Sequence, residues 1–149
     1  MLLVSYDSIF KSSAEVLVNP VNTVGIMGAG LALQFKMRYP AMYVRYRALC
    51  DNHSMRVGAV VPIPMDNSAD RYIVCFPTKR HYRDASQLQY IEDGLIDLRS
   101  LITTMQVSSI ALPALGCGLG SLSWRDVEPL IIAFAKSLPD VVVTVYPPQ

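Results

Sequence analysis

Short runs of apolar residues alternate along the chain with longer segments in which apolar residues recur every three or four positions. The short runs predict six strands, at residues 2–5, 16–19, 59–63, 72–76, 109–112 and 141–146. Apolar strands that alternate with helices form a sheet covered by helices on both faces. The pattern therefore predicts an α/β fold with strands buried on both sides.

The helical segments are predicted at residues 29–38, 40–51, 88–102 and 123–137. In the third, apolar residues recur at steps of three and four, and Ser86 with Gln89 forms a capping box ahead of it. In the last, Pro129 removes a backbone hydrogen bond. Either Asp126 is the true N-cap of that helix, or its first turn is irregular.

Composition narrows the class of protein. The 149 residues fit one domain spanning 1–149, 52 % are hydrophobic, and 17 % are charged. No apolar run is long enough for a membrane span, and the N-terminus resembles a strand more than a signal peptide. We therefore expect a cytoplasmic monomer. A net charge of +1 argues against a broad nucleic-acid surface but leaves room for a local one.

The cysteines do not indicate a metal site or a disulfide framework. Cys50, Cys75 and Cys117 include no Cys-x-x-Cys pair, and their odd number leaves one unpaired. Cys75 lies in an apolar strand, where free cysteine is usually just buried. Cys50 and His53 make a single Cys-x-x-His pair without a second one. We expect no metal and no cofactor.

Two glycine-rich loops each follow a predicted strand and precede a helix. The first, NPVNTVGIMGAG at residues 19–30, is compatible with an irregular connection alone or with close approach to a ligand. The second, PALGCGLGSLSW at residues 113–124, alternates glycines so that its N–H groups could converge on an anion, although a tight turn would look similar. It matches neither the dinucleotide fingerprint nor the P-loop.

A basic stretch forms the third element. FPTKRHYRD, at residues 76–84, follows a predicted buried strand and includes Lys79, Arg80, His81 and Arg83. Taken alone, such a stretch is usually a solvated surface loop. Loops after different parallel strands meet at the carboxyl edge of the sheet, where α/β proteins bind ligands. A pyrophosphate, which needs N–H donors on two sides, would suit the resulting cleft.

Together the three loops resemble the macrodomain family of ADP-ribose-binding modules. The resemblance rests on the segments DSI at residues 7–9, NPVN at 19–22, GAG at 28–30 and PALGCGLG at 113–120. It spans essentially the whole chain and implies a three-layer α/β/α sandwich with a mixed central sheet. The segment FPTKRH at residues 76–81 is similar to the subgroup that contains DarG-type antitoxin macrodomains and, more distantly, the terminal ADP-ribose protein glycohydrolase.

The resemblance implies a role for each motif. Asp7 would accept a hydrogen bond from the adenine, and the amide of Ile9 would support the ring. Asn22 would hold the distal ribose, and Lys79 would be catalytic. The remaining residues expected to bind ADP-ribose are Ser8, Gly28, Ala29, Gly30, Leu31, Thr78, Pro113, Leu115, Gly116, Cys117, Gly118, Leu119 and Gly120.

A lysine suits the reaction that the resemblance implies. The bond to be broken lies at the anomeric carbon of the distal ribose, a masked aldehyde, which a neutral amine can attack to form a Schiff base. The amine could instead act as a base. Either role requires loss of a proton, and nearby Arg80 and Arg83 would disfavour the charged form.

The expected activity is removal of ADP-ribose from thymidine in single-stranded DNA, with Arg80, His81, Tyr82 and Arg83 as candidate DNA contacts. The subgroup also implies a cognate DNA-modifying toxin as a partner. The distant relative carries an acidic residue in the second glycine loop, where this chain has Gly120. Hydrolysis of ester-linked ADP-ribose on proteins, and a reader without catalysis, remain the alternatives.

Overall fold

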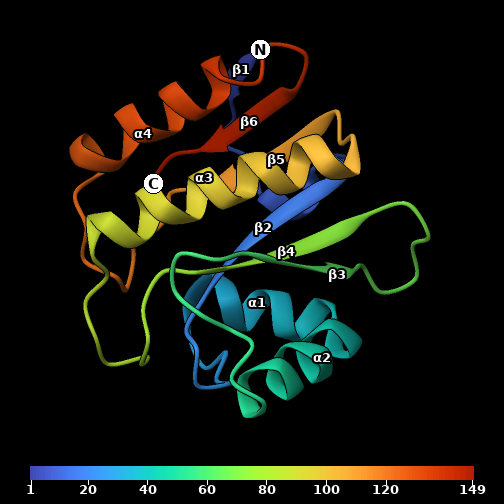
Figure 1. Cartoon of the computed structure of the whole chain (residues 1–149), viewed down its shortest axis with the longest axis vertical. Coiled ribbons are helices and arrows are strands. Elements are labelled where there is room, and N and C mark those ends of the chain that lie inside the picture. The colour runs from blue at the N-terminus through green and yellow to red at the C-terminus, as the bar shows by residue number, and fades with distance from the viewer.

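The fold is built on one mixed sheet of six strands, which a computed structural model describes for all residues 1–149. The strand order is β1-β6-β5-β2-β4-β3, and only β3 runs antiparallel to its neighbour. The strands span Leu2–Val4 (β1), Val16–Val21 (β2), Val61–Pro64 (β3), Tyr72–Pro77 (β4), Ser109–Pro113 (β5) and Val142–Tyr146 (β6). Figure 1 shows β2 crossing the middle of the molecule.

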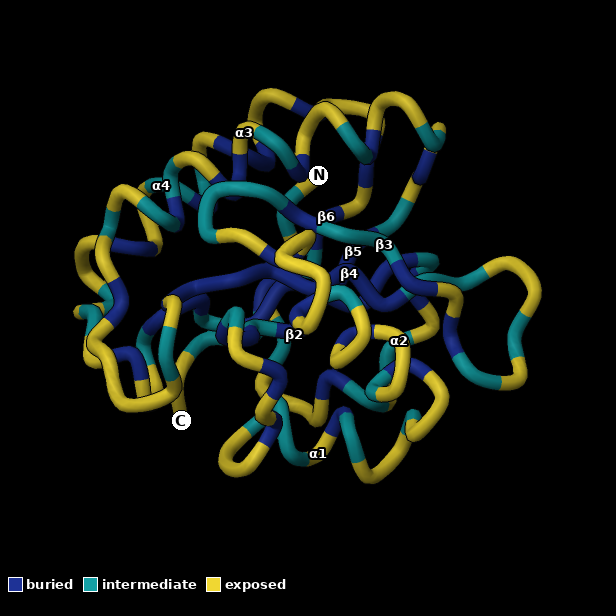
Figure 2. The backbone as a smooth tube through the Cα atoms, turned by 60° about the horizontal axis from the view of Figure 1, so that its bottom comes forward, coloured by how far each residue is buried: buried dark blue, intermediate teal, exposed yellow.

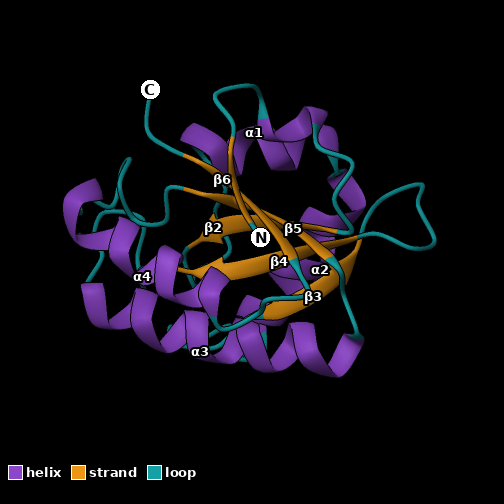
Figure 3. Cartoon of the chain, turned by 90° about the horizontal axis from the view of Figure 1, so that it is seen from above, coloured by secondary structure: helices purple, strands orange, loops and turns teal.

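Four helices cover the two faces of this sheet. They span Gly30–Arg38 (α1), Pro40–Asp51 (α2), Leu88–Met105 (α3) and Trp124–Lys136 (α4), with a short 3₁₀ turn at Ile9–Lys11. Helices α3 and α4 lie on one face, and α1 and α2 on the other (Figure 3). The predicted three-layer sandwich with a mixed sheet is confirmed. No helix combines the length and apolar character needed to cross a bilayer.

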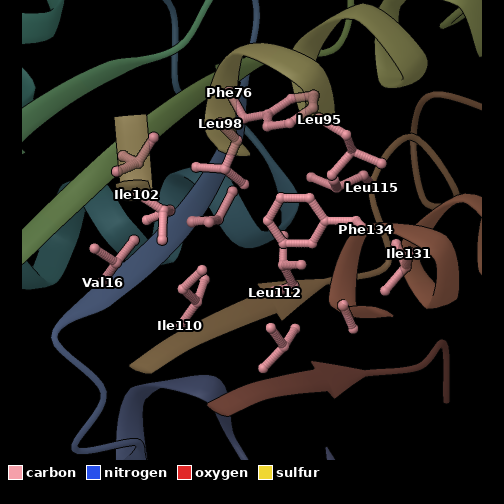
Figure 4. Close-up of a cluster of buried hydrophobic side chains, with 14 of the residues drawn as sticks. Val16, Phe76, Leu95, Leu98, Ile102, Ile110, Leu112, Leu115, Ile131 and Phe134 are labelled. Carbon is pink, nitrogen blue, oxygen red and sulfur yellow. The ribbon is translucent and has the colours of Figure 1, made fainter. Parts of the chain in front are cut away.

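Each face of the sheet has its own hydrophobic core. Because successive strand residues point to opposite faces, Val16 and Val18 of β2 pack under α3 and α4, whereas Leu17 packs under α1 and α2. Figure 4 shows part of the first core, and Figure 2 shows the central strands as the most buried part of the backbone. Strands buried on both faces explain why they appear in the sequence as unbroken apolar runs.

The predicted capping box ahead of α3 is wrong. Gln87 is the N-cap and makes no side-chain capping bond. The side chain of Gln89 points along the helix and donates to Asp93 at 2.8 Å. The backbone N–H of Ser86 donates to the carbonyl of Gly120 at 2.9 Å, which ties this residue to another loop instead.

Of the two alternatives for the start of α4, the irregular first turn is the one that the structure supports. Ser123, not Asp126, occupies the N-cap. The N–H groups of Asp126 and Val127 both donate to the carbonyl of Ser123, at 3.0 and 3.2 Å, so the first turn is partly 3₁₀ in character. Pro129 lies inside the helix on its exposed side, where water can replace the missing bond.

The topology brings five strand ends to one edge of the sheet. Strands β1, β6, β5, β2 and β4 are mutually parallel, so their carboxyl ends share that edge. Strand β2 lies between β5 and β4, which places the loops after these three strands side by side. Each of the three sequence motifs begins in the last residues of one of these strands and continues into the loop after it.

Helix α3 packs very closely on β4 at Gly94. A methyl group added there would lie 2.3 Å from the ring of Phe76, far inside normal contact distance. Phe76 is fully buried and lies near the end of the strand that leads to Lys79. The absence of a side chain at Gly94 thus sets the spacing of helix and strand near the basic loop.

We expect Gly94→Ala to lower the free energy of unfolding by about 1–3 kcal/mol, because overpacking outweighs the roughly 1 kcal/mol that alanine gains in a helix. Urea unfolding of both forms measures the change. Gly118→Ala is the matched control, since nothing lies within 4 Å of its added methyl group. An increase in stability for Gly94→Ala would show that α3 can move away from the sheet at little cost.

Candidate functional site

A cavity of about 1040 Å³ opens at the carboxyl edge of the sheet. Its walls come from the segments that follow β1, β2, β4, β5 and β6. It is lined by Ser8, Ile9, Phe10, Pro20, Val21, Asn22, Ile26, Gly28, Ala29, Gly30, Leu31, Ala32, Gln34, Thr78, Lys79, Tyr82, Pro113, Ala114, Gly116, Cys117, Gly118, Leu119, Gly120, Tyr146, Pro147, Pro148 and Gln149. The three motif loops therefore border one space.

Two residues expected to bind ligand do not line this cavity. Leu115 is fully buried and belongs to the core under α3 and α4, near Phe134 (Figure 4). Its side chain is therefore not available to a ligand, because the sharp turn at Gly116 directs it inward while its neighbours face the cavity. Asp7 lies just outside the lining set, next to Ser8.

The carboxylate of Asp7 is exposed and already has local partners. It accepts a hydrogen bond from the N–H of Ser8 at 2.9 Å and lies 3.2 Å from Nζ of Lys11. The Ser8 bond first, and then Lys11, lower the pKa of Asp7 below its usual value. Asp7 therefore stays ionised at neutral pH, as a hydrogen-bond acceptor for an amino group must.

The start of α1 forms one wall of the cavity. Its N-cap, Ala29, has no side chain that could accept from the first-turn N–H groups. Gly30, Leu31 and Ala32 all line the cavity, so these unpaired donors and the positive end of the helix dipole border it. Such a wall suits a phosphate group.

The second glycine loop lies opposite this helix end. A methyl group at Gly30 would come within 3.4 Å of Leu119, so the two loops are in near contact. Gly116 has a φ of +74°, and a methyl group there would lie 2.7 Å from Leu122. The loop therefore has room for a side chain at Cys117 but not at Gly116. Burial raises the pKa of the Cys117 thiol.

Gly120 has no room for a side chain either. A methyl group there would lie 2.3 Å from Oγ of Ser86 and 2.6 Å from the carbonyl oxygen of Gly116. Oγ of Ser86 is itself buried and has no hydrogen-bond partner. The loop geometry therefore excludes an acidic residue at position 120 unless its surroundings also change.

Asn22 organises the loop that follows β2. Its amide nitrogen donates to the carbonyl of Ile26 at 2.7 Å, and its amide oxygen accepts from the N–H of Val24 at 3.1 Å. The hydroxyl of Tyr46, from α2, lies 2.8 Å from both oxygens of Asn22. Tyr46 is fully buried, and burial raises its pKa, so it remains a hydrogen-bond donor.

Lys79 lies beside Asn22 because the ladder between β2 and β4 continues past the strands. The N–H of Thr78 donates to Val21, and the N–H of Thr23 donates to Arg80, each at 2.9 Å. These two bonds flank Asn22 and Lys79, and both residues line the cavity. Lys79 is only 9 % exposed, and its amine donates to the carbonyl of Tyr82 at 2.9 Å.

Lys79 has no acidic partner. The single ion pair of the protein joins Lys11 and Asp7, so no carboxylate lies within 4 Å of the Lys79 amine. The following turn is held by Asp84, whose carboxylate accepts from the N–H of His81 at 3.1 Å and whose N–H donates to the carbonyl of His81 at 3.0 Å. The loop thus places a buried amine next to a turn that hydrogen bonds to Asp84 stabilise.

Among the candidate DNA contacts, only Tyr82 lines the cavity. The ring of His81 lies 4.1 Å from that of Tyr82, and the guanidinium of Arg83 lies 5.5 Å from it. Arg80 points elsewhere and donates to the hydroxyl of Tyr90 at 2.8 Å. His81 and Arg83 thus surround Tyr82 at the rim, whereas Arg80 faces away from the cavity.

Several lining residues were not predicted from the sequence. Tyr146, Pro147, Pro148 and Gln149 lie at the end of β6 and after it, and Gln149 donates to the carbonyl of Tyr6 at 2.8 Å. The rule that parallel strands end at one edge would have found them, because β6 was predicted. Phe10 gave no signal in the sequence, since its place depends on contact with Phe35, 4.7 Å away between ring centres. No group of three potential metal ligands is present.

The comparisons with known proteins agree with this geometry. The family model described as Macro domain matches residues 18–131. A Mycobacterium tuberculosis protein named DNA ADP-ribosyl glycohydrolase is 41 % identical over 150 residues, which cover 99 % of this chain and 43 % of that protein. This chain therefore spans less than half the length of that relative.

Two solved structures are closely similar. The macrodomain of Mycobacterium tuberculosis DarG superposes with a TM-score of 0.97 at 40 % identity, covering 100 % of this chain and 99 % of that one. Thermosipho africanus DarTG in complex with ADP-ribose gives a TM-score of 0.92 at 33 % identity, covering 99 % of this chain and 42 % of that one.

We expect Tyr46→Phe to destabilise the protein by about 1–3 kcal/mol and to weaken ADP-ribose binding, because the one buried donor that the two oxygens of Asn22 share is lost. Urea unfolding and calorimetric titration with ADP-ribose measure the two effects. Tyr6→Phe, at an exposed tyrosine, should change stability by less than about 0.5 kcal/mol. Equal behaviour of the two variants would mean that Tyr46 does not hold the Asn22 loop.

Proposed function

The chain belongs to the macrodomain family, and on that premise we propose that it removes ADP-ribose from thymidine in single-stranded DNA. The proposal rests above all on Lys79, a buried amine that lines the cavity beside Asn22. The relative named DNA ADP-ribosyl glycohydrolase supports DNA as the substrate, because its similarity covers 99 % of this chain.

In the proposed complex, ADP-ribose lies along the cavity from the end of β1 to the end of β4. Asp7 and the segment Ser8–Phe10 receive the adenine. The pyrophosphate lies between the uncapped start of α1 and the loop at residues 116–120, where N–H donors are available from two sides. This order leaves the distal ribose at Asn22 and Lys79, on the adjoining ends of β2 and β4.

Lys79 would carry out the chemical step. Its unprotonated amine attacks the anomeric carbon of the distal ribose, the bond from that carbon to the base breaks, and the base leaves with a proton. The bond from the same carbon to the ring oxygen then opens, which converts the adduct into a Schiff base, and water hydrolyses this Schiff base to restore the amine and release ADP-ribose. In the alternative route, the amine takes a proton from water or from a ribose hydroxyl, and no covalent adduct forms.

The second glycine loop favours a mechanism without a carboxylate. Gly120 cannot hold an acidic side chain next to Ser86 and Gly116, and no carboxylate pairs with Lys79. Hydrolysis of any adduct would then depend on water that is oriented by backbone groups and by Asn22. The proposed mechanism therefore differs from one in which an acidic residue helps to release the adduct from the lysine.

The modified DNA would approach from the rim formed by Tyr82. Its exposed ring could stack on an unpaired base, while His81 and Arg83 hold the ring in place. The activity named for the relative also supports a DNA-modifying toxin as the cognate partner, because an enzyme that removes ADP-ribose from DNA implies another that attaches it. Ester-linked ADP-ribose on proteins is the second candidate substrate, since the same amine could act on the same carbon.

We expect Lys79→Ala to lower the rate of cleavage of an oligonucleotide bearing ADP-ribosyl-thymidine by at least about 100-fold. Its affinity for free ADP-ribose should change by only a few fold, because Lys79 acts on the reacting carbon. Chromatographic separation of modified and unmodified oligonucleotide gives the rate, and titration calorimetry gives the affinity.

Lys136→Ala, an exposed lysine on α4, is the matched control and should behave as the wild type. Binding without cleavage by the wild type would contradict the DNA substrate. An assay with ADP-ribosylated protein would then decide between the ester hydrolase and a reader without catalysis. Full activity of Lys79→Ala would remove the lysine mechanism.

A further inference from the structure

A second cavity, of about 420 Å³, lies next to the proposed active site. It is lined by Thr23, Cys50, His53, Met55, Arg56, Val57 and Arg80. These residues come from the loop after β2, the end of α2 with the segment after it, and the loop after β4. None of them lines the first cavity.

The wall between the two cavities is a single pair of hydrogen-bonded segments. Asn22 and Lys79 line the first cavity, and the next residue of each segment, Thr23 and Arg80, lines the second. The N–H and the hydroxyl of Thr23 both donate to the carbonyl of Arg80 at 2.9 Å. Since consecutive Cα atoms are about 3.8 Å apart, the two cavities are immediate neighbours.

The second cavity is basic. Arg56 and Arg80 line it together with His53, and no lining residue is acidic. Neither arginine has a carboxylate partner, because the single ion pair of the protein involves Lys11 and Asp7. A surface bordered by two arginines, with no acid among the lining residues to neutralise them, favours an anion.

Each of the two guanidinium groups makes a hydrogen bond to a neutral group. Nε of Arg56 donates to the carbonyl of His53 at 3.3 Å, and Nη1 of Arg80 donates to the hydroxyl of Tyr90 at 2.8 Å. A guanidinium has five N–H donors, so each keeps most of them for a ligand. The hydroxyl of Thr23 is already used by Arg80, which leaves the arginines as the main donors.

We infer that the second cavity binds a phosphodiester of the DNA strand that flanks the modified nucleotide. This inference rests on the proposed function and extends it. A strand carries a phosphate on each side of every nucleoside, so a thymidine held at Lys79 brings a phosphate toward Arg80 and Arg56. Such a contact positions the strand without recognising its sequence. It would also favour DNA over an ADP-ribosylated protein, which has no backbone phosphate.

Arg56→Gln tests the inference, because this residue is remote from Lys79 in sequence and lines only the second cavity. We expect kcat/KM for the ADP-ribosylated oligonucleotide to fall roughly five- to tenfold, and affinity for unmodified single-stranded DNA to fall similarly. Cleavage of ADP-ribosyl-thymidine nucleoside, which lacks the phosphodiesters of a strand, and binding of free ADP-ribose should not change. Arg99→Gln, at an exposed arginine on α3, is the matched control.

A substrate series then identifies the phosphate. In each oligonucleotide, one phosphodiester near the modified thymidine is replaced by an uncharged methylphosphonate. If Arg56 contacts one phosphate, the effect of Arg56→Gln on kcat/KM should disappear at that position and persist at the others. An effect that persists at every position, or that also appears with the nucleoside, would overturn the inference.

The outcomes also separate this inference from the proposed function. If the wild type cleaves the oligonucleotide and Arg56→Gln behaves as Arg99→Gln, the function stands and the phosphate site is wrong. If the wild type does not cleave but Arg56→Gln still weakens binding of single-stranded DNA more than Arg99→Gln does, the phosphate site stands and the hydrolase proposal fails. If neither cleavage nor an Arg56-dependent affinity is observed, both are wrong.

Discussion

The pairing of β2 with β4 and β5 determines how the candidate site is arranged. Its parallel ladders to β4 and β5 fix where three chain segments leave the sheet, and the ladder to β4 continues as far as Thr23 and Arg80. Backbone hydrogen bonds, rather than side-chain packing, thus hold Asn22 beside Lys79. The site is therefore attached to a strand that is buried on both faces, which is the kind of support that a catalytic arrangement would need.

The two walls of the large cavity differ in how they are built. The glycine loops offer backbone N–H groups, which carry partial charge and need no counter-ion. The basic loop offers a full amine that is buried without an acidic partner. The backbone N–H groups thus lie where a permanently negative part of the ligand would be bound. The single amine lies where the bond would be broken. This separation would allow the proposed binding and the proposed chemistry to depend on different residues.

Much of this could be predicted from the sequence, and the reasons are physical. Strands buried on both faces appear as apolar runs, and parallel strand ends share an edge, so the amino-acid pattern alone could bring Asn22, Lys79 and the glycine loops together. Tyr46, Phe10 and Arg56 could not be predicted, because their places depend on how helix and loop side chains pack. The capping box failed for a similar reason, since a long-range bond to Gly120 displaced Ser86 from its expected role.

The crowding around Gly120 also constrains how this protein can evolve. A side chain at that position meets Oγ of Ser86, which a substitution could remove, and the carbonyl of Gly116, which only a shift of the loop could relieve. A single substitution that introduces a carboxylate there would therefore disturb the loop before it contributed any chemistry. Evolution from a site without a carboxylate at this position to a site with one would therefore need at least two substitutions. The order of these substitutions would matter.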